Sequence, residues 1–284
     1  MLKLFIAFFV CILTTTIGFS QPKAHLSINT DIANDSILYR TGFRFVEEAV
    51  SRSFSPINVS DSAFAIKLKQ IKAAKCKVIA ANSFLPGHLK LVGPVINEAA
   101  VLGYVDTVMR RAATAGLKVV VLGSGAARQI PEGFDRDTAK KQFVIIVRKM
   151  AEVAAKYRIP IAMENLNKGE CNFINSVAEG LEIARLINHP NFKLTADIYH
   201  MLRENEPASS IIDAREYIIH CHIAENKERG YPGKFGEDFR PYLKALRSIG
   251  FTGVLSMECP WKDMKTELPV AFKYLQQQLD EAYQ

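Results

Sequence analysis

The sequence predicts a single α/β domain folded as a closed (β/α)8 barrel, the TIM-barrel fold, after a signal peptide. Short apolar runs alternate with helical stretches eight times along the chain. Eight such units with short connections favour a closed parallel barrel over an open sheet. Four of the apolar runs also end in a side chain that can bind a metal, at the strand ends where such barrels carry their chemistry.

The expected strands are short and apolar. They cover residues 25–30, 43–48, 76–82, 118–123, 159–165, 193–198, 217–224 and 253–259. The run from Val119 to Leu122 is continuously apolar, which is typical of a strand buried on both faces. The expected helices cover residues 36–41, 60–75, 95–115, 137–157, 175–188, 207–214, 237–249 and 266–282. The helix at 137–157 has the clearest helical spacing of apolar residues, and Asp137 is its expected N-cap.

Residues 1–20 are expected to be a signal peptide. Lys3 precedes an apolar run from Leu4 to Ile17, and the small residues Gly18 and Ser20 follow it. The run is short for a membrane span, so we expect residues 21–284 to form the barrel after cleavage. An uncleaved anchor or a buried first helix is the alternative. The prediction places the protein in the periplasm or outside the cell, without membrane contact after cleavage.

The composition indicates which partners to expect. The formal net charge is +7, but the clustered lysines at 67–75 alternate with apolar residues on one expected helix, as on an ordinary solvated face. We therefore expect no nucleic acid partner. Four cysteines follow the signal segment without a CxxC pair, and a chain of this size can bury its own core, so buried free thiols are favoured over disulfides.

Four expected strand ends carry a residue that can bind a divalent metal. The runs end at Glu164, Asp197, His222 and Glu258. Because the carboxyl ends of parallel strands meet at one rim of a barrel, we expect these side chains to converge. Each one alone has a structural alternative as an N-cap or a loop anchor. Several carboxylates buried together are costly without a cation, which favours a metal site for the set.

Three carboxylates and one imidazole favour Mn²⁺, with Mg²⁺, Co²⁺ and Zn²⁺ as alternatives. Four protein ligands leave about two positions open in an octahedral site, enough for two neighbouring oxygens of a hydroxy-ketone or an aldose. A carboxylate beside such a substrate can remove the proton next to the carbonyl and give an enediolate. Glu164 and Glu258 lie on non-adjacent expected strands and are the candidate acid–base pair.

Other side chains near the expected strand ends have two interpretations each. His200 either binds the substrate or makes a structural hydrogen bond, whereas His220 is expected to be a packed, hydrogen-bonded core histidine. Phe84 and Trp261 either stack on a sugar or pack in the interior. The glycine-rich stretch 226–238 is the candidate for a mobile lid over the barrel mouth.

On these residues the chain resembles the xylose isomerase-like TIM-barrel superfamily. Within it, the chain is most similar to the sugar phosphate isomerase/epimerase group, which includes tagatose 3-epimerase-like enzymes. The segments that carry the resemblance are Met-Glu164-Asn, Ala-Asp197-Ile-Tyr-His200, His220-Cys-His222-Ile-Ala-Glu and Ser-Met-Glu258. The resemblance covers nearly all of residues 21–284 and is strongest from Lys118 to Trp261.

The resemblance implies one divalent metal and a set of roles. The metal would be held by Glu164, Asp197, His222 and Glu258, with Glu164 and Glu258 as the acid–base pair. By the same matching, Glu170, His200 and Arg229 are expected to bind the substrate. The family's arginine lies six residues after the metal-binding histidine, where this chain has Glu228, so Arg229 fits only with a one-residue insertion.

The superfamily also contains AP endonucleases with a multi-zinc site. Those enzymes need histidines at the third and fourth strand ends, where this chain has Asn82 and Ser124. DNA repair is therefore not expected.

The expected function is that of a divalent-metal-dependent sugar isomerase or epimerase acting on a small-molecule carbohydrate. Export favours a free sugar or sugar derivative over a sugar phosphate. Two alternatives stay open. The same metal and base would serve a lyase that eliminates from a 3-keto-glycoside, and a non-catalytic sugar-binding barrel would share the fold without the chemistry. A homo-oligomer is compatible with either.

Overall fold

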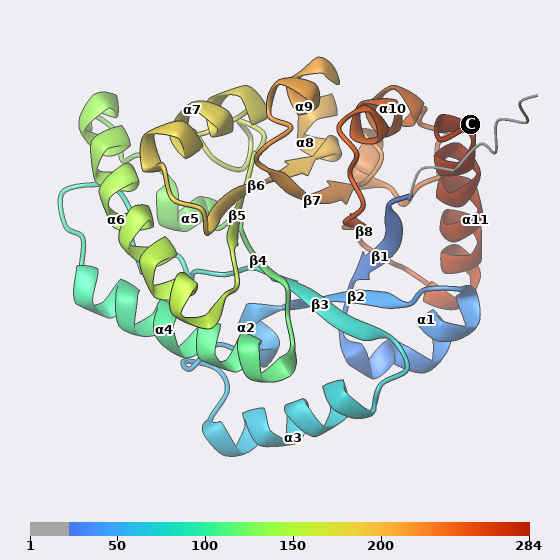
Figure 1. The fold of residues 1–284 in the computed structure, drawn as a ribbon, viewed down its shortest axis with the longest axis horizontal. Helices are drawn as coiled ribbons and strands as arrows, with labels where there is room; N and C mark the ends of the chain where they lie inside the picture. Colours follow the sequence, from blue (N-terminus) through green and yellow to red (C-terminus); the bar gives the residue numbers. More distant parts are fainter. Residues whose placement is uncertain (1–22) are drawn as a thin grey trace, which may run out of the picture.

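The computed structural model describes residues 23–284, which form the predicted eight-stranded parallel barrel (Figure 1). Each strand pairs with the next in the chain, and β1 pairs with β8 to close the barrel. The strands are β1 His25–Asn29, β2 Phe45–Ala49, β3 Lys77–Asn82, β4 Val119–Leu122, β5 Ile161–Glu164, β6 Phe192–Asp197, β7 Ile218–Ile223 and β8 Val254–Met257. The predicted fold is confirmed, while the expected signal peptide at residues 1–20 lies outside the described residues.

Helices cover the outside of the barrel (Figure 1). The predicted helices correspond to α1 Asp35–Thr41, α3 Asp61–Ala73, α4 Glu98–Ala115, α6 Arg136–Tyr157, α7 Val177–Ile187, α9 Ser209–Asp213, α10 Arg240–Ser248 and α11 Met264–Ala282. Five shorter segments follow strand ends: η1 Ile32–Asn34, α2 Val50–Ser53, α5 Gly125–Arg128, α8 Ile198–Arg203 and η2 Lys227–Arg229. One or two turns are too short to show a helical period in the sequence.

The start of α6 corrects one prediction. The N-cap is Asp135 rather than Asp137, because the Asp135 side chain accepts a hydrogen bond from the backbone N–H of Thr138 at 2.7 Å. The helix begins at Arg136, so Asp137 is its second residue. A negative charge there still favours the helix dipole, so both aspartates suit the start of the helix and only one can cap it.

The strands separate two kinds of interior. Outward-facing side chains such as Ile28, Val120 and Leu194 pack beneath the helices in the main apolar core. A smaller apolar cluster fills one part of the barrel itself and consists of Ala80, Val119 and Ala162. Cys76, Cys171 and Cys221 are buried and Cys259 is partly buried, and all four thiols are free, as predicted. Between residues 23 and 284, no helix has the length and apolar character needed to cross a membrane.

The strand register brings the polar ends of four strands to one rim of the barrel. Glu164 on β5 lies opposite Thr195 on β6, Asp197 lies opposite His222 on β7, and His222 lies opposite Ser256 on β8. These pairings place the ends of four consecutive strands at the same rim. The rim at the carboxyl ends of the strands is therefore the place to look for chemistry.

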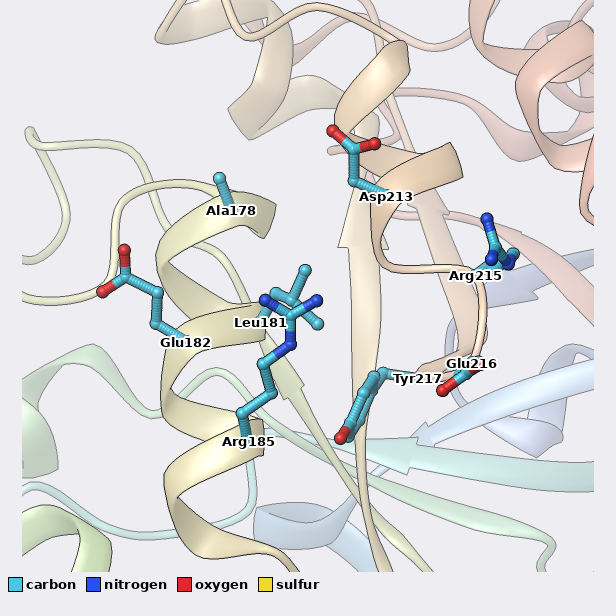
Figure 2. A pocket seen from close by; sticks show the side chains of 8 residues that line it. All are labelled: Ala178, Leu181, Glu182, Arg185, Asp213, Arg215, Glu216 and Tyr217. Atoms are coloured by element: carbon cyan, nitrogen blue, oxygen red, sulfur yellow. The ribbon is translucent and has the colours of Figure 1, made fainter.

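A separate groove of about 520 Å³ lies on the flank of the barrel, between α7 and the segment that joins α9 to β7 (Figure 2). Its lining is polar and mixed in charge, with Arg185 from α7 facing Asp213 and Tyr217. Tyr217 directly precedes β7, so this groove lies at the amino end of that strand. His222 lies near the opposite end, and the groove is not part of the site described below.

Candidate metal centre

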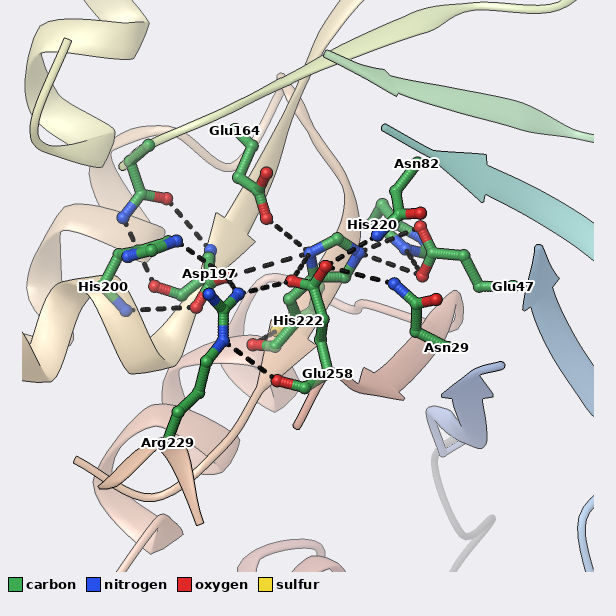
Figure 3. A network of polar contacts seen from close by, with 12 residues as sticks. Asn29, Glu47, Asn82, Glu164, Asp197, His200, His220, His222, Arg229 and Glu258 are labelled. Carbon is green, nitrogen blue, oxygen red and sulfur yellow. Dashed lines mark hydrogen bonds and ion pairs between the residues drawn. The ribbon is translucent and has the colours of Figure 1, made fainter. Parts of the chain in front are cut away.

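The carboxyl ends of β5 to β8 bring the four predicted ligands together (Figure 3). One donor atom from each of Glu164, Asp197, His222 and Glu258 lies within 4.8 Å of all the others. The centre of the group is Nδ1 of His222, which is 2.5 Å from Glu164 Oε1, 3.2 Å from Glu258 Oε2 and 3.8 Å from Asp197 Oδ2. The side chain of Glu258 is 22% exposed and the other three are buried, so Glu258 borders the opening.

Asp197 shows why a cation fits this cluster. It ends β6 and caps α8, because its Oδ1 accepts from the backbone N–H of His200 at 3.1 Å. Its Oδ2 is buried and has no hydrogen-bond partner. Burying a carboxylate oxygen without a hydrogen bond is costly. A metal ion bound by this oxygen and by the neighbouring donor atoms would offset that cost. Asp197 can therefore serve as the N-cap of α8 through Oδ1 and as a metal ligand through Oδ2.

Glu164 reaches the centre because a glycine follows the neighbouring strand. Gly123 directly follows β4, and a Cβ at this position would overlap Glu164 Oε2. The backbone carbonyl of Glu164 accepts a hydrogen bond from Nη2 of the fully buried Arg128 at 2.7 Å. The position of Glu164 is thus set from both its backbone and its side chain.

Three side chains donate hydrogen bonds to Glu258: Asn29 and Asn82, which were not predicted as site residues, and Arg229, which was predicted to bind the substrate. The side-chain amides of Asn29 and Asn82 donate to its Oε1 at 3.1 Å and 2.6 Å. Arg229 donates to its Oε2 at 2.8 Å. Asn29 and Asn82 are the last residues of β1 and β3. The signal that finds them is a polar residue of any kind at a strand end, rather than a metal-binding one.

The charges in the cluster shift the titration of its members. Burial, together with the nearby charge of Glu258, raises the pKa of Glu164 and of Asp197. Burial opposes the ionisation of Glu258, but the charges of His222 and Arg229 outweigh it and lower the pKa of Glu258 to about 2. Burial also favours a neutral His222 ring, yet the carboxylates around it raise the pKa of His222 well above its usual value.

This pattern of shifts describes a site that attracts positive charge. The surrounding carboxylates stabilise a proton on His222, and they would stabilise a divalent cation in the same way. Metal binding would displace that proton, since a ligating ring nitrogen needs its lone pair. The donor set of three carboxylates and one imidazole therefore fits a divalent metal.

Arg229 contacts two carboxylates at the rim of the barrel. Its guanidinium bridges Glu258 and Glu170, at 2.8 Å and 3.2 Å, and lies 4.7 Å from the ring centre of Tyr199. Glu228 and Arg229 both adopt left-handed backbone conformations, with φ of 58° and 48°. Glu228 pairs with Lys234 at the surface, and the predicted one-residue insertion relative to the family stays a prediction.

His200 presents a hydrogen-bond donor toward the site. Its Nδ1 accepts from the backbone N–H of Asn167 at 3.1 Å, so the ring proton resides on Nε2. Nε2 is buried without a hydrogen-bond partner and lies 3.5 Å from Asp197 Oδ2 and 3.9 Å from Glu170 Oε2. Burial lowers the pKa of His200, which keeps the ring neutral. The three residues expected to bind substrate, Glu170, His200 and Arg229, thus lie beside the candidate metal ligands.

The loop from 226 to 238 has a fixed base. The buried carboxylate of Glu225 accepts hydrogen bonds from four backbone N–H groups of this loop, those of Gly233, Phe235, Gly236 and Glu237. Glu225 thereby shapes the loop that carries Arg229. The mobility expected of a lid stays a prediction.

The structure shows the surroundings of Phe84 and Trp261, the two candidates for stacking on a sugar, and of His220. Phe84 is fully buried beside Tyr104, so its interpretation as a sugar-stacking residue is wrong. Trp261 stacks on Tyr231, with ring centres 5.7 Å apart. His220 is a buried, hydrogen-bonded histidine, as predicted, and its partner is Glu47.

Comparison with known proteins identifies the family. A family model described as "Xylose isomerase-like TIM barrel" matches residues 37–279. The chain belongs to this family. A second result agrees on the fold: the crystal structure of the apo form of a 3-keto-D-glucoside 4-epimerase from E. coli superposes with a TM-score of 0.77 at 19% identity, covering 90% of this chain and 100% of that one.

Curated members of the family that resemble this chain are named epimerases and isomerases. An L-ribulose 3-epimerase from Methylomonas sp. (strain DH-1) is 35% identical over 116 residues, which is 40% of each chain. A 3-dehydro-D-guloside 4-epimerase from Escherichia coli (strain K12) is 24% identical over 226 residues, covering 76% of this chain and 85% of the relative. The match thus spans two fifths of the first relative and most of the second.

Proposed function

We propose that this chain is a divalent-metal-dependent sugar isomerase or epimerase that moves a proton next to a carbonyl group. One observation carries the proposal: the carboxylates of Glu164, Asp197 and Glu258 surround Nδ1 of His222 at the rim of the barrel. The names of the relatives support epimerisation of a sugar or sugar derivative. Proton transfer at a carbon next to a carbonyl needs both a base and a stabilised oxyanion, and this cluster suits both.

Glu164, Asp197, His222 and Glu258 would hold the metal, and we propose Mn²⁺ as the ion in use because the donor set is rich in hard oxygen ligands. When bound, the ion supplies positive charge beside the carbonyl and hydroxyl oxygens of the substrate and so favours loss of the neighbouring proton.

Glu258 and Glu164 are the proposed proton-transfer groups. Glu258 stays ionised at neutral pH, since its pKa is lowered to about 2, and its two oxygens are oriented by Asn29, Asn82 and Arg229. Glu164 is the second carboxylate of the cluster and would return the proton; its raised pKa is a property of the metal-free site. Their strands, β5 and β8, are not neighbours in the barrel, so the two carboxylates would approach a substrate from different directions. Removal of the proton by one of them would give an enediolate, to which the other would return a proton.

The residues beside the metal ligands suit a polyol. His200 offers an N–H donor, Glu170 offers carboxylate acceptors, and Arg229 offers further donors. A sugar hydroxyl both donates and accepts, so a mixed set of this kind can orient two or three adjacent oxygens. Glu170, His200 and Arg229 are therefore the proposed substrate-binding residues.

We also propose that the protein acts in the periplasm or outside the cell. The basic, apolar and small-residue pattern of residues 1–20 supports this, and it favours a free sugar, an oxidised sugar or a glycoside as substrate. N-terminal sequencing of the exported protein is expected to begin near residue 21. Recovery of the intact N-terminus in the cytoplasm would contradict this part of the proposal.

Solvent deuterium incorporation tests the reaction. The protein with added Mn²⁺ is incubated in D₂O with ketoses, aldoses and 3-keto-glycosides and followed by NMR. Metal-dependent exchange at one carbon, lost with chelator and in a Glu258→Gln variant, is the expected result, and the labelled position identifies the reacting carbon. Sugar binding without exchange across the panel would support a non-catalytic binding barrel instead.

A lyase acting on a 3-keto-glycoside is the second candidate. The observation that favours such a substrate is the match over 85% of the length of a 3-dehydro-D-guloside 4-epimerase. After removal of the proton next to the keto group, the glycosidic oxygen would leave with its bonding electrons. In an epimerase, a proton would instead be returned to the carbon. Mass spectrometry separates the two reactions, because epimerisation conserves the mass of the substrate and elimination splits it.

A further inference from the structure

A second buried cluster lies inside the barrel next to the proposed metal ligands (Figure 3). Glu47 on β2 faces two histidines of β7. Its carboxylate oxygens are 2.9 Å and 3.0 Å from Nε2 of His222, and one of them is 3.1 Å from Nε2 of His220. All three side chains are fully buried. The sequence pattern does not point to Glu47, and the proposed mechanism does not use it.

Hydrogen-bond chemistry fixes which ring nitrogen of His222 carries a proton toward Glu47. An ionised carboxylate only accepts hydrogen bonds, so each imidazole nitrogen that faces Glu47 must be an N–H donor. His222 therefore has a hydrogen on Nε2, on the side of Glu47. Its other nitrogen, Nδ1, faces Glu164, Asp197 and Glu258. The side of the ring away from Glu47 is the one that points into the proposed metal site.

We propose that Glu47 is a positioning residue for the metal centre. It holds His222 in the tautomer and ring orientation that present the Nδ1 lone pair to a divalent cation, and His220 in turn holds Glu47. Carboxylates behind a metal-binding histidine orient the ring and raise its basicity. This inference rests on the metal-binding part of the proposed function, but not on the sugar chemistry.

The chain contains a matched control beside Glu47. Glu48 is the next residue of β2 and is also fully buried, but its side chain leaves the barrel on the opposite face. There it accepts hydrogen bonds from the backbone N–H of Ile32 at 3.0 Å and from Nε of Arg52 at 2.6 Å. The two glutamates share a strand, a charge and a degree of burial. They differ in whether the carboxylate contacts His222.

Metal affinity of the purified full chain is the first test, measured by calorimetric titration of the chelator-treated protein with Mn²⁺. Glu47→Gln keeps the shape and one acceptor oxygen but removes the charge, and its Kd for Mn²⁺ is expected to rise by about 10- to 100-fold. Glu48→Gln is expected to change the Kd by less than about threefold, within the context-dependent scatter of such measurements. An unchanged Kd in Glu47→Gln, with only a loss of metal-free stability, would show a purely structural role and overturn the proposal.

Further readouts separate failure of this inference from failure of the proposed function. A wild-type chain that binds no metal defeats both. A wild-type chain that binds two ions, one of which is lost in Glu47→Gln, overturns this inference alone, since Glu47, His220 and His222 would then form a second metal site. Should Glu47→Gln fail to fold, His220→Gln removes one donor to Glu47 and a ring contact with His222 but keeps the hydrogen bond between His222 and Glu47. It is expected to weaken Mn²⁺ binding by a smaller factor.

The tautomer itself can be observed by nitrogen-15 NMR of the Mg²⁺-loaded protein with labelled histidine. A proton on Nε2 of His222 in the wild type is the expected signature, together with a mixture of tautomers in Glu47→Gln. A proton on Nδ1 of His222 in the loaded wild type would overturn the proposal.

Discussion

The two halves of the barrel contribute differently to the site. The second half, β5 to β8, supplies all four proposed metal ligands: Glu164, Asp197, His222 and Glu258. In the first half, β1 to β4, the strand ends supply none of these four ligands. The first half supplies instead the groups that hold or make room for the ligands, either within a strand or at its end: Asn29, Glu47, Asn82 and Gly123. The comparison separates the residues that would bind the ion from the residues that orient them.

The contacts between the halves are distant in sequence. Asn29 is 229 residues from Glu258, and Glu47 is 175 residues from His222. The oriented ligand set therefore exists only when the barrel is closed. A metal that binds this set binds the folded state and should stabilise the whole barrel, by about 2.7 kcal/mol when the free ion is at a hundred times its Kd.

The largest effect is expected in the second half, where the proposed base resides. Glu258→Gln should lower the rate of solvent exchange by roughly 10²- to 10⁴-fold, the usual contribution of a positioned acid–base group, while the circular dichroism spectrum stays native. Glu228→Gln is the control, because Glu228 lies on the neighbouring loop but pairs with Lys234 at the surface. Retained exchange in Glu258→Gln would remove this residue from the proposed mechanism.

In the first half, a glycine leaves the space that one ligand occupies. Gly123→Ala places a methyl group where Glu164 Oε2 now lies, so the ligand must move and the affinity for Mn²⁺ should fall at least tenfold, equivalent to about 1.4 kcal/mol. Gly103→Ala on α4 is the matched control, since a Cβ there meets nothing within 4 Å. It should leave metal binding unchanged and stabilise the helix by about 0.5–1 kcal/mol. Equal affinities in the two variants would contradict the geometry.

The difference between the halves also explains what the sequence can predict. The ligands of the second half each end an apolar run in a metal-binding side chain, and four such ends in succession form a recognisable pattern. Glu47 lies within Val46-Glu47-Glu48-Ala49, and the sequence does not say which of the two glutamates faces inward. The strand register decides that. One signal was available: a charged residue in a strand buried on both faces requires a buried partner.

Local backbone geometry accounts for the other differences. Arg229 reaches Glu258 because two successive residues adopt left-handed conformations, and no spacing rule reports that. Asp135 and Asp137 are both good N-caps, and only the start of α6 at Arg136 distinguishes them. The strands and long helices were predictable because apolar periodicity extends over many residues, whereas α5 and α8 are too short to show it.

A smaller effect is expected from the amides of the first half. Asn82→Ala removes the 2.6 Å hydrogen bond to Glu258 Oε1, and a hydrogen bond to a charged group contributes about 1.5–3 kcal/mol. The exchange rate should fall by roughly ten- to a hundredfold, and less in Asn29→Ala, whose bond to the same oxygen is 3.1 Å. Asn191→Ala is the control, because its amide binds the carbonyl of Ile159 instead. The prediction fails if Asn82→Ala and Asn191→Ala exchange equally fast.

The smallest expected effect is a pH dependence that comes from the second half alone. Glu164, Asp197 and His222 have raised pKa values in the metal-free protein, so these three groups bind more protons in the folded chain than in the unfolded chain. The lowered pKa of the buried His200 has the opposite effect and offsets part of this difference below about pH 7. The protonated His222 ring stabilises the folded state fully when the pH is below the pKa of histidine in the unfolded chain. This stabilisation is lost as the pH rises through the raised pKa of the folded state. The metal-free protein should therefore lose stability as the pH rises from 6 to 8, as linkage at a pKa near 6.5 in the unfolded state requires.

A bound cation replaces the protons and should relieve this loss. The difference in Tm between Mn²⁺-loaded and chelated protein should accordingly widen from pH 6 to pH 8, by roughly 2–4 °C for each kcal/mol in a domain of this size. Glu47 in the first half has a lowered pKa, stays ionised throughout this range and adds nothing to the trend. Differential scanning calorimetry at several pH values measures the difference. A gap that narrows with rising pH would mean that the folded, metal-free site does not retain the extra protons, and the charge balance described for the ligand half of the barrel would be wrong.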